Sequence, residues 1–224
     1  MKRTLLLLLA ILATLAPFAT AEDAATPIDA DGKPVATIVI PADAMPSVAW
    51  AAEELQSHVK QMTGAELAIQ RVDKAEADTG DEPQILLDAV AVASAGLDLD
   101  GLAKEGFIIR AGGKTLAIAG QGKRGTLYGV YALLERLGVR WWTPFETRIP
   151  KARSLAVPAL ELRDEPGLAY RDIMARETHG EAGQLWMARN RMNGMIWQDA
   201  DEKIGGRYRF GGRMLAHTFM QLLK

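Results

Sequence analysis

A short stretch in the last quarter of the chain concentrates side chains that can bind a polar ligand. The candidate substrate-binding residues are Arg171, Arg176, His179, Asn193 and His217. Each arginine presents a planar fork that can hold vicinal hydroxyls or a carboxylate. Asparagine and histidine add further hydrogen-bond donors and acceptors. The alternative is a solvated loop, because charged residues prefer the protein surface.

Several other catalytic chemistries lack their residues in this sequence. The chain has no cysteine, so neither a thiol nucleophile nor a disulfide is available. No G-x-S-x-G motif marks a serine nucleophile. Neither His179 nor His217 lies in a spacing typical of metal ligands, and we therefore predict no metal and no cofactor. Asp172 and Glu177 are carboxylates close to the candidate residues, but nothing supports either as a proton donor.

Residues 120–125 read Gly-Gln-Gly-Lys-Arg-Gly, a formal match to the G-x-G-x-x-G of dinucleotide-binding loops, and Glu146 lies near the expected acidic position. The strand before this motif belongs to a predicted hairpin and not to a parallel βαβ unit, which disfavours a nucleotide. We expect the glycines to let the backbone turn tightly into the next helix. An exported oxidoreductase with a nucleotide cofactor is therefore the least favoured function.

Two adjacent tryptophans, Trp141 and Trp142, lie on a predicted strand, so their rings should point to opposite faces. We expect one ring to enter the core. The other is free to stack on a sugar or on a neighbouring domain, and the alternative is that both serve packing.

The elements that position these residues are apolar strands and amphipathic helices. Apolar and β-branched runs predict strands at residues 36–40, 67–72, 84–87, 107–110, 115–119 and 139–142. Helical spacing of apolar residues predicts one helix from Pro46 to Gly64 and another that ends at Gly138. We predict an α+β domain over residues 35–157, in which two helices cover one face of a mostly antiparallel sheet.

From residue 158 the pattern indicates the beginning of a second domain. Residues 169–174 are predicted to form a strand and residues 182–192 a helix, and Ile196-Trp197 opens another strand. A (β/α)8 barrel needs about 250 residues. We therefore interpret residues 158–224 as the start of a truncated (β/α)8 barrel.

The first residues have the features of a secretory signal peptide. Lys2 and Arg3 precede the apolar run 5–16, and Ala19-Thr20-Ala21 supplies the small residues of a cleavage site. The run is shorter than the roughly 20 apolar residues of a membrane span. We predict a signal peptide at residues 1–21, a linker at residues 22–34, and a periplasmic or secreted bacterial protein without stable membrane insertion after cleavage. An uncleaved anchor is the alternative.

The overall composition is that of an ordinary globular protein. The chain is 49% hydrophobic and 24% charged, with a formal net charge of −2 at pH 7. This charge argues against a nucleic-acid partner, which attracts basic surfaces.

Residues 125–141, which read GTLYGVYALLERLGVRW, resemble the helix of the non-catalytic α+β domain that precedes the barrel in bacterial β-hexosaminidases and α-glucuronidases. They are also similar to related large exported proteins of glycoside-hydrolase type. Residues 49–56, AWAAEELQ, resemble the first helix of that domain. The resemblance extends from about Thr37 to the chain end. It is moderately specific for the domain and weak for any single activity.

The resemblance implies a role for two of the candidate residues. Ala169-Tyr170-Arg171-Asp172 is similar to the first barrel strand of hexosaminidases, where the arginine grips sugar hydroxyls. Residues 173–175 lack the family's usual Leu-Asp pair, which puts N-acetylhexosamine specificity in doubt. His217-Thr218-Phe219 resembles a second barrel strand whose histidine faces the pocket.

The resemblance also implies what this chain lacks. Sugar hydrolysis needs two carboxylates, and by resemblance these lie in a C-terminal barrel beyond Lys224. We therefore predict the non-catalytic N-terminal portion of an exported glycoside hydrolase that acts on polysaccharide or oligosaccharide. Its partners would be a carbohydrate substrate and the missing barrel. The alternative is a free-standing carbohydrate-binding module that uses Trp141 or Trp142.

Overall fold

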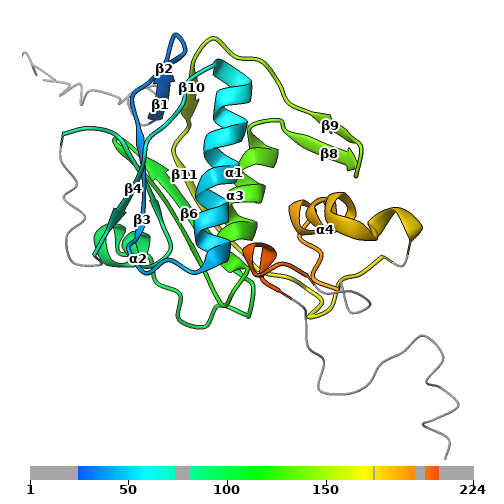
Figure 1. The fold of residues 1–224 in the computed structure, drawn as a ribbon. Coiled ribbons are helices and arrows are strands. Elements are labelled where there is room, and N and C mark those ends of the chain that lie inside the picture. Colours follow the sequence, from blue (N-terminus) through cyan, green and yellow to red (C-terminus); the bar gives the residue numbers. More distant parts are fainter. Residues whose placement is uncertain (1–24, 74–80, 174, 195–199, 207–224) are drawn as a thin grey trace, which may run out of the picture.

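A six-stranded sheet lies at the centre of the computed structural model, which describes residues 25–73, 81–173, 175–194 and 200–206. The strand order across the sheet is β11-β6-β7-β5-β3-β4 (Figure 1). In chain order these strands are β3 (Thr37–Pro41), β4 (Ile69–Val72), β5 (Gln84–Leu87), β6 (Phe107–Gly112), β7 (Thr115–Gly120) and β11 (Leu160–Asp164). The strands predicted from apolar runs are therefore present, with small differences at their ends.

The sheet is mixed, which confirms the α+β class but corrects the expectation of a mostly antiparallel sheet. Strand β3 runs parallel to β4 and β5, and β5 runs parallel to β7. Strand β6 alone runs in the opposite direction to the other five, so it is antiparallel to its neighbours β7 and β11. The reason lies in the connections. Helix α1 (Pro46–Thr63) returns the chain from the end of β3 to the end of the sheet where β3 begins. Strand β4 can therefore pair with β3 in parallel.

Two long helices cover one face of the sheet, as predicted. Helix α1 (Pro46–Thr63) has a proline in its first turn and ends at Gly64, which adopts a φ of 91° and donates its backbone N–H to Lys60 O. Helix α3 (Gly125–Arg136) packs beside α1 (Figure 1). Their apolar sides and the sheet form the main core, in which Leu55 and Val130 are almost fully buried.

A third helix, which was not predicted, lies on the opposite face of the sheet. Helix α2 (Ala89–Ala95) packs Val90 and Ala91 against Val39, Leu86 and Ala117. The helix contains only alanine, valine and serine, so no polar stripe marks its helical period in the sequence.

Residues 25–34 form strands and not the predicted linker. Strand β1 (Thr26–Ala30) pairs with β2 (Lys33–Pro34) and with β10 (Leu155–Val157) in a small antiparallel sheet. Ile28 is only 1% exposed and belongs to the main core. Asp31 and Gly32 supply the two positive φ angles of the tight turn between β1 and β2. The burial of Ile28 in the main core explains why β1 packs against the rest of the α+β unit.

Two further findings concern the boundary predicted near residue 157. Strand β11 continues the central sheet up to Asp164, so the α+β unit extends past that boundary. Strands β8 (Arg140–Thr143) and β9 (Glu146–Arg148) form a separate two-stranded hairpin beside the helices. The predicted strand at 139–142 is therefore present but lies outside the central sheet.

Residues 165–206 carry little regular structure in the described part of the chain. The 3-10 helix η1 (Arg176–Thr178) precedes α4 (Gly180–Arg189), and the 3-10 helix η2 (Glu202–Ile204) follows. The predicted helix at 182–192 is thus present, but it begins two residues earlier and ends three residues earlier. Residues 169–173 form a loop and not the predicted strand, because no described strand lies beside them to supply a ladder of hydrogen bonds. The predicted leader, the strand at Ile196-Trp197 and His217 lie outside the described residues.

No helix among the described residues is long and apolar enough to cross a lipid bilayer.

Candidate functional site

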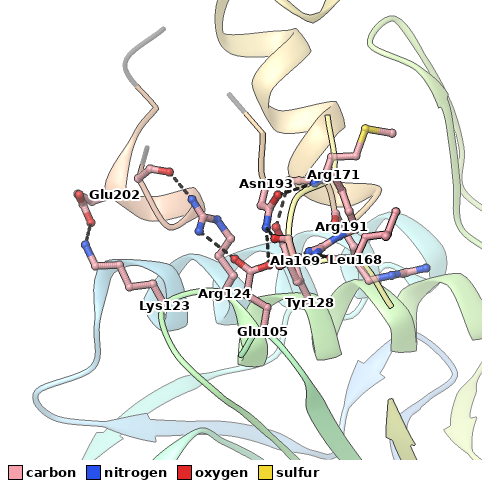
Figure 2. Close-up of polar contacts among 12 residues, drawn as sticks. Glu105, Lys123, Arg124, Tyr128, Leu168, Ala169, Arg171, Arg191, Asn193 and Glu202 are labelled. Carbon is pink, nitrogen blue, oxygen red and sulfur yellow. Dashed lines mark hydrogen bonds and ion pairs between the residues drawn. The ribbon is translucent and has the colours of Figure 1, made fainter. Parts of the chain in front are cut away.

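The structure brings together only two of the sequence-predicted site residues. Arg171 and Asn193 meet in a buried polar cluster on the outer side of α3 (Figure 2). Arg176 and His179 are exposed at the two ends of η1 and do not join this cluster. His217 lies outside the described residues.

Glu105, which sequence reasoning did not single out, is the centre of the cluster. The residue is only 3% exposed, and its φ of 68° is rare for a residue with a side chain. One carboxylate oxygen accepts a hydrogen bond from Arg124 Nη1 at 3.1 Å. The other accepts from Arg171 Nη2 and Asn193 Nδ2, each at 2.7 Å (Figure 2). A buried carboxylate with two arginines and an amide is fully satisfied as an acceptor.

All three guanidinium nitrogens of Arg171 are bonded to protein acceptors. Besides the bond to Glu105, Nε donates to Arg191 O at 2.8 Å and Nη1 donates to Leu168 O at 2.6 Å. The guanidinium also lies over the ring of Tyr128, 5.8 Å from its centroid. The arginine therefore joins the loop at residue 168, the turn at residue 191 and the α+β unit. Its expected role on sugar hydroxyls stays a prediction.

Asn193 holds the same loop from the other side. Its Oδ1 accepts from Arg171 N at 2.9 Å, and its Nδ2 donates to Ala169 O at 2.9 Å as well as to Glu105. The backbone N–H of Asn193 in turn donates to Arg171 O at 3.0 Å. These bonds replace the ladder of a strand, since the loop 169–171 finds its backbone partners on a side chain and a neighbouring turn.

Tyr128 on α3 forms the floor of the cluster. Its hydroxyl donates to Met192 O at 3.0 Å. Burial, with a smaller contribution from the Glu105 carboxylate, raises the pKa of Tyr128 well above its usual value. The tyrosine therefore stays neutral and acts as a hydrogen-bond donor and packing surface. A pocket of about 170 Å³ opens beside it and is bounded in part by Glu165 and Arg191.

A second set of contacts attaches α4 to the two long helices. Arg189 donates from Nε and Nη2 to the two carboxylate oxygens of Glu54 on α1, at 2.8 and 2.9 Å. Trp186 Nε1 donates to Trp141 O at 3.0 Å. Arg191 forms an ion pair with Glu135 on α3. The described residues between 168 and 194 are therefore held to the outer face of the helices by several charged side chains.

The buried acidic residues of the described chain are all engaged in holding the fold. Glu54 binds Arg189, and Glu105 binds two arginines. Asp29 accepts from the backbone N–H groups of Leu155 at 2.8 Å and Gly32 at 3.0 Å. A glycosidase needs one carboxyl that gives up a proton and a second that faces the sugar. Each of these three carboxylates is instead hydrogen-bonded to other groups of the fold. The described residues contain no group of three or more His, Asp or Glu placed to hold a metal ion.

The glycines at residues 120–125 form the predicted tight turn into the helix, and Gly120 and Gly125 also pack closely against each other. A Cβ on Gly120 would lie 2.3 Å from the backbone of Gly125, and a Cβ on Gly125 would lie 2.6 Å from Gly106 O. Only glycine permits this approach between the end of β7 and the start of α3. The strand after α3 is β8, which pairs with β9 and not with the central sheet. The βαβ unit that a dinucleotide needs is therefore not formed by β7, α3 and β8.

The two tryptophans point in opposite directions, as predicted. Trp141 is 4% exposed and packs edge-on against Tyr131 and His58, with ring centroids 5.5 Å apart in both pairs. Trp142 is 57% exposed. The buried ring belongs to the core, whereas the exposed ring is available to a ligand or partner.

These features define a class of protein: an α+β unit with two long helices on its sheet and a further segment ion-paired to their outer face. The sequence pattern of the family described as the glycosyl hydrolase family 67 N-terminus matches residues 22–133, which is half of the chain. The chain belongs to this family.

Similarity to known proteins is confined to part of their length. The chain is 32% identical over 73 residues to a β-hexosaminidase of Porphyromonas gingivalis, and this match covers 33% of the chain and 9% of the relative. One similar solved structure is a family GH115 4-O-methyl-α-glucuronidase with specificity for decorated arabinogalactans. Its sequence is 20% identical to this chain and its TM-score is 0.50, and the match covers 64% of this chain and 19% of the glucuronidase. The N-acetyl-β-hexosaminidase of Streptomyces plicatus is 16% identical with a TM-score of 0.43, over 66% of this chain and 24% of its own. The glucuronidase supports the fold, and this chain is related to glycoside hydrolases.

Proposed function

We propose that this chain is the non-catalytic N-terminal portion of an exported glycoside hydrolase that acts in the breakdown of polysaccharide or oligosaccharide. The observation that carries the proposal is the ion-paired attachment of the described residues between 168 and 194 to α1 and α3. An α+β unit that fixes the beginning of the next domain so firmly is suited to be the platform of that domain.

The state of the buried carboxylates supports the non-catalytic part of the proposal. Glu105 borders the pocket of about 170 Å³ beside Tyr128, but both of its carboxylate oxygens, like those of Glu54, are bound by arginines. The acid and base of the reaction would then belong to a C-terminal barrel, which is the partner that this proposal requires.

The extent of the comparisons supports the same assignment. The matching family is described as an N-terminus, and the chain spans 9% of the curated relative and 19% of the solved glucuronidase. A carbohydrate substrate follows from this family membership. The candidate contacts to that substrate remain Arg176, His179 and His217. The loop at residues 168–171, which precedes them in the chain, would be aligned by Arg171 and Asn193.

Export to the periplasm or the medium is part of the proposal. Its support is the sequence of residues 1–21, in which Lys2 and Arg3 precede an apolar run and the Ala19-Thr20-Ala21 site. Expression of the whole reading frame in a bacterium should yield a periplasmic protein whose first residue is Glu22. A cytoplasmic protein that keeps Met1 would refute export.

Activity assays on the purified chain test the catalytic part. We expect no hydrolysis of a panel of aryl β-glucosides, N-acetyl-β-glucosaminides and α-glucuronides, because the proposal assigns the paired carboxylates to the C-terminal barrel. Turnover that follows the protein through purification would show that the chain is an enzyme by itself.

A free-standing carbohydrate-binding module is the second candidate function. The exposed ring of Trp142 favours it. Such a module would need no further sequence, so the whole chain should melt in one cooperative transition and resist protease. Protease cleavage confined to the C-terminal side of these ion-paired residues, with the α+β unit and Arg171 to Arg191 left intact, would favour the platform function.

A further inference from the structure

A groove beside the β8–β9 hairpin is independent of the ion-paired cluster described above. It has a volume of about 360 Å³ and lies between the hairpin and residues 173–186. Its aromatic wall is made by Trp142, Phe145 and Trp186. The volume is near the lower end of the range for small-molecule sites, which is on the order of 300 Å³.

The aromatic side chains of the groove are exposed although they are large and apolar. Trp142 is 57% exposed and Phe145 is 81% exposed, and Ile173 at the rim is 42% exposed. Isolated apolar residues on a surface need no explanation, but a cluster of them around a groove is typical of a binding site. The described part of the chain thus presents two aromatic rings to solvent at one place.

The backbone of the hairpin fixes these rings in position. The register of β8 and β9 shifts between Trp141 and Thr143, so Trp142 lies at a β-bulge. Bulges redirect a side chain and are common next to functional sites. Phe145 lies in the turn that follows, where its backbone N–H donates to Thr143 Oγ1 at 3.2 Å. The inner wall is fixed as well, since Trp186 Nε1 is bonded to Trp141 O.

The polar groups of the groove indicate which ligand it prefers. Glu177 is the only ionisable side chain among the described residues that line it, and no arginine or lysine is present among them. A carboxylate accepts hydrogen bonds from hydroxyl groups. The same carboxylate repels an anionic ligand at close range. The groove is therefore suited to a ligand with an apolar ring face and neutral hydroxyls.

We propose that this groove binds a neutral pyranose sugar, which stacks its C–H face on Trp142 and Phe145 and donates hydroxyl protons to Glu177. This inference rests on the proposed function only for the choice of carbohydrate as ligand. It adds a sugar contact on the α+β unit itself, away from the catalytic barrel, and it selects neutral sugars over uronates. The competing occupant is a polypeptide surface of the barrel.

The test is a titration of the purified, 15N-labelled chain with cellotriose, chitotriose and trigalacturonate, observed by NMR at the tryptophan indole N–H signals. We expect the two neutral trisaccharides to shift the Trp142 signal, identified by its loss in Trp142→Phe, and the anionic one to leave it unchanged. Trp142→Ala and Phe145→Ala should each weaken binding about tenfold, as the loss of one stacked ring implies. Glu177→Gln should remove the discrimination against trigalacturonate.

The matched control is Leu168→Ala, which removes another exposed apolar side chain outside the groove lining. It should bind as the parent does, and all these positions are exposed, so the variants should fold. The proposal fails if neither neutral sugar binds, if binding is unchanged in Trp142→Ala, or if trigalacturonate binds best. A folded, inactive chain that binds no sugar would contradict this inference alone, whereas an active one would contradict the proposed function.

Discussion

Glu54 on α1 and Arg189 on α4 form a two-point ion pair, with donor–acceptor distances of 2.8 and 2.9 Å, although they are 135 positions apart in the sequence. The Glu54 side chain is only 5% exposed in this pair. A buried ion pair contributes little net stability when complete, but loss of one partner leaves the other charge uncompensated. This pair therefore controls whether α4 can stay against the long helices.

We predict that Glu54→Gln lowers the free energy of unfolding by about 3 kcal/mol, because Arg189 is left buried without a counter-charge. Urea denaturation followed by circular dichroism measures this change. The control is Glu66→Gln, which breaks the exposed pair with Lys60 and should change stability by less than about 0.5 kcal/mol. Equal effects of the two substitutions would contradict the argument.

The Arg171 fork should hold residues 168–194 against the α+β unit. We expect Arg171→Met to remove the bonds to Glu105, Arg191 and Leu168 and to cost about 2 kcal/mol. Limited trypsin digestion with mass spectrometry should then show faster cleavage after Arg189 and Arg191.

The matched control for the Arg171 variant is Arg176→Met, which removes an exposed arginine. It should leave the rate of cleavage at the other sites unchanged. If Arg171→Met also leaves that rate unchanged, the cluster does not hold the segment.

His58 on α1 should make stability depend on pH. Burial lowers its pKa below the usual value of 6.5, and the nearby Glu54 opposes this only in part. The unfolded chain therefore binds a proton on this group at a higher pH than the folded chain does. Its contribution is complete above pH 6.5 and is lost as the pH falls from 6.5 toward the folded pKa.

Urea midpoints measured at pH 8, 7, 6 and 5 check this prediction. The loss of stability between pH 7 and pH 5 should be smaller in His58→Gln than in the parent, although the variant is less stable at pH 8. Parallel pH profiles for the two proteins would show that His58 does not contribute.

Gly125 should not tolerate a side chain, because a Cβ there would meet Gly106 O and the backbone of Gly120 at 2.6 Å. We expect Gly125→Ala to lower the free energy of unfolding by about 2 kcal/mol. Gly112→Ala is the matched control, since a Cβ at that position has no atom within 4 Å. Thermal unfolding of both variants distinguishes them, and a lower melting temperature for the Gly112 variant would disprove the packing explanation.

Secondary-structure elements that are marked by residues within or next to them could be predicted from the sequence. The residues of β5 (Gln84–Leu87) and the ends of α1 at Pro46 and Gly64 match the prediction, because an apolar run, a proline and a glycine mark them directly. The opposite orientations of Trp141 and Trp142 follow in the same way from the alternation of a strand.

The order and direction of the strands were not predictable in this way. Strands β3 and β5 are unbroken apolar runs, which indicates that both of their faces are covered. Such a run does not record which strand lies beside it. The loop at Arg171 is a comparable case. The sequence of residues 169–174 is interpreted as a strand, but no neighbouring strand is described beside residues 169–173.

By itself, the sequence determined the α+β class, the two long helices, the tight glycine turn before α3 and the opposite orientations of the two tryptophans, because these depend on spacing and backbone geometry over a few residues. Only the tertiary structure decided that Glu105 gathers Arg124, Arg171 and Asn193, and that Glu54 meets Arg189. Those partners are far apart along the chain, and no local pattern in a sequence records which charges meet once the chain has folded.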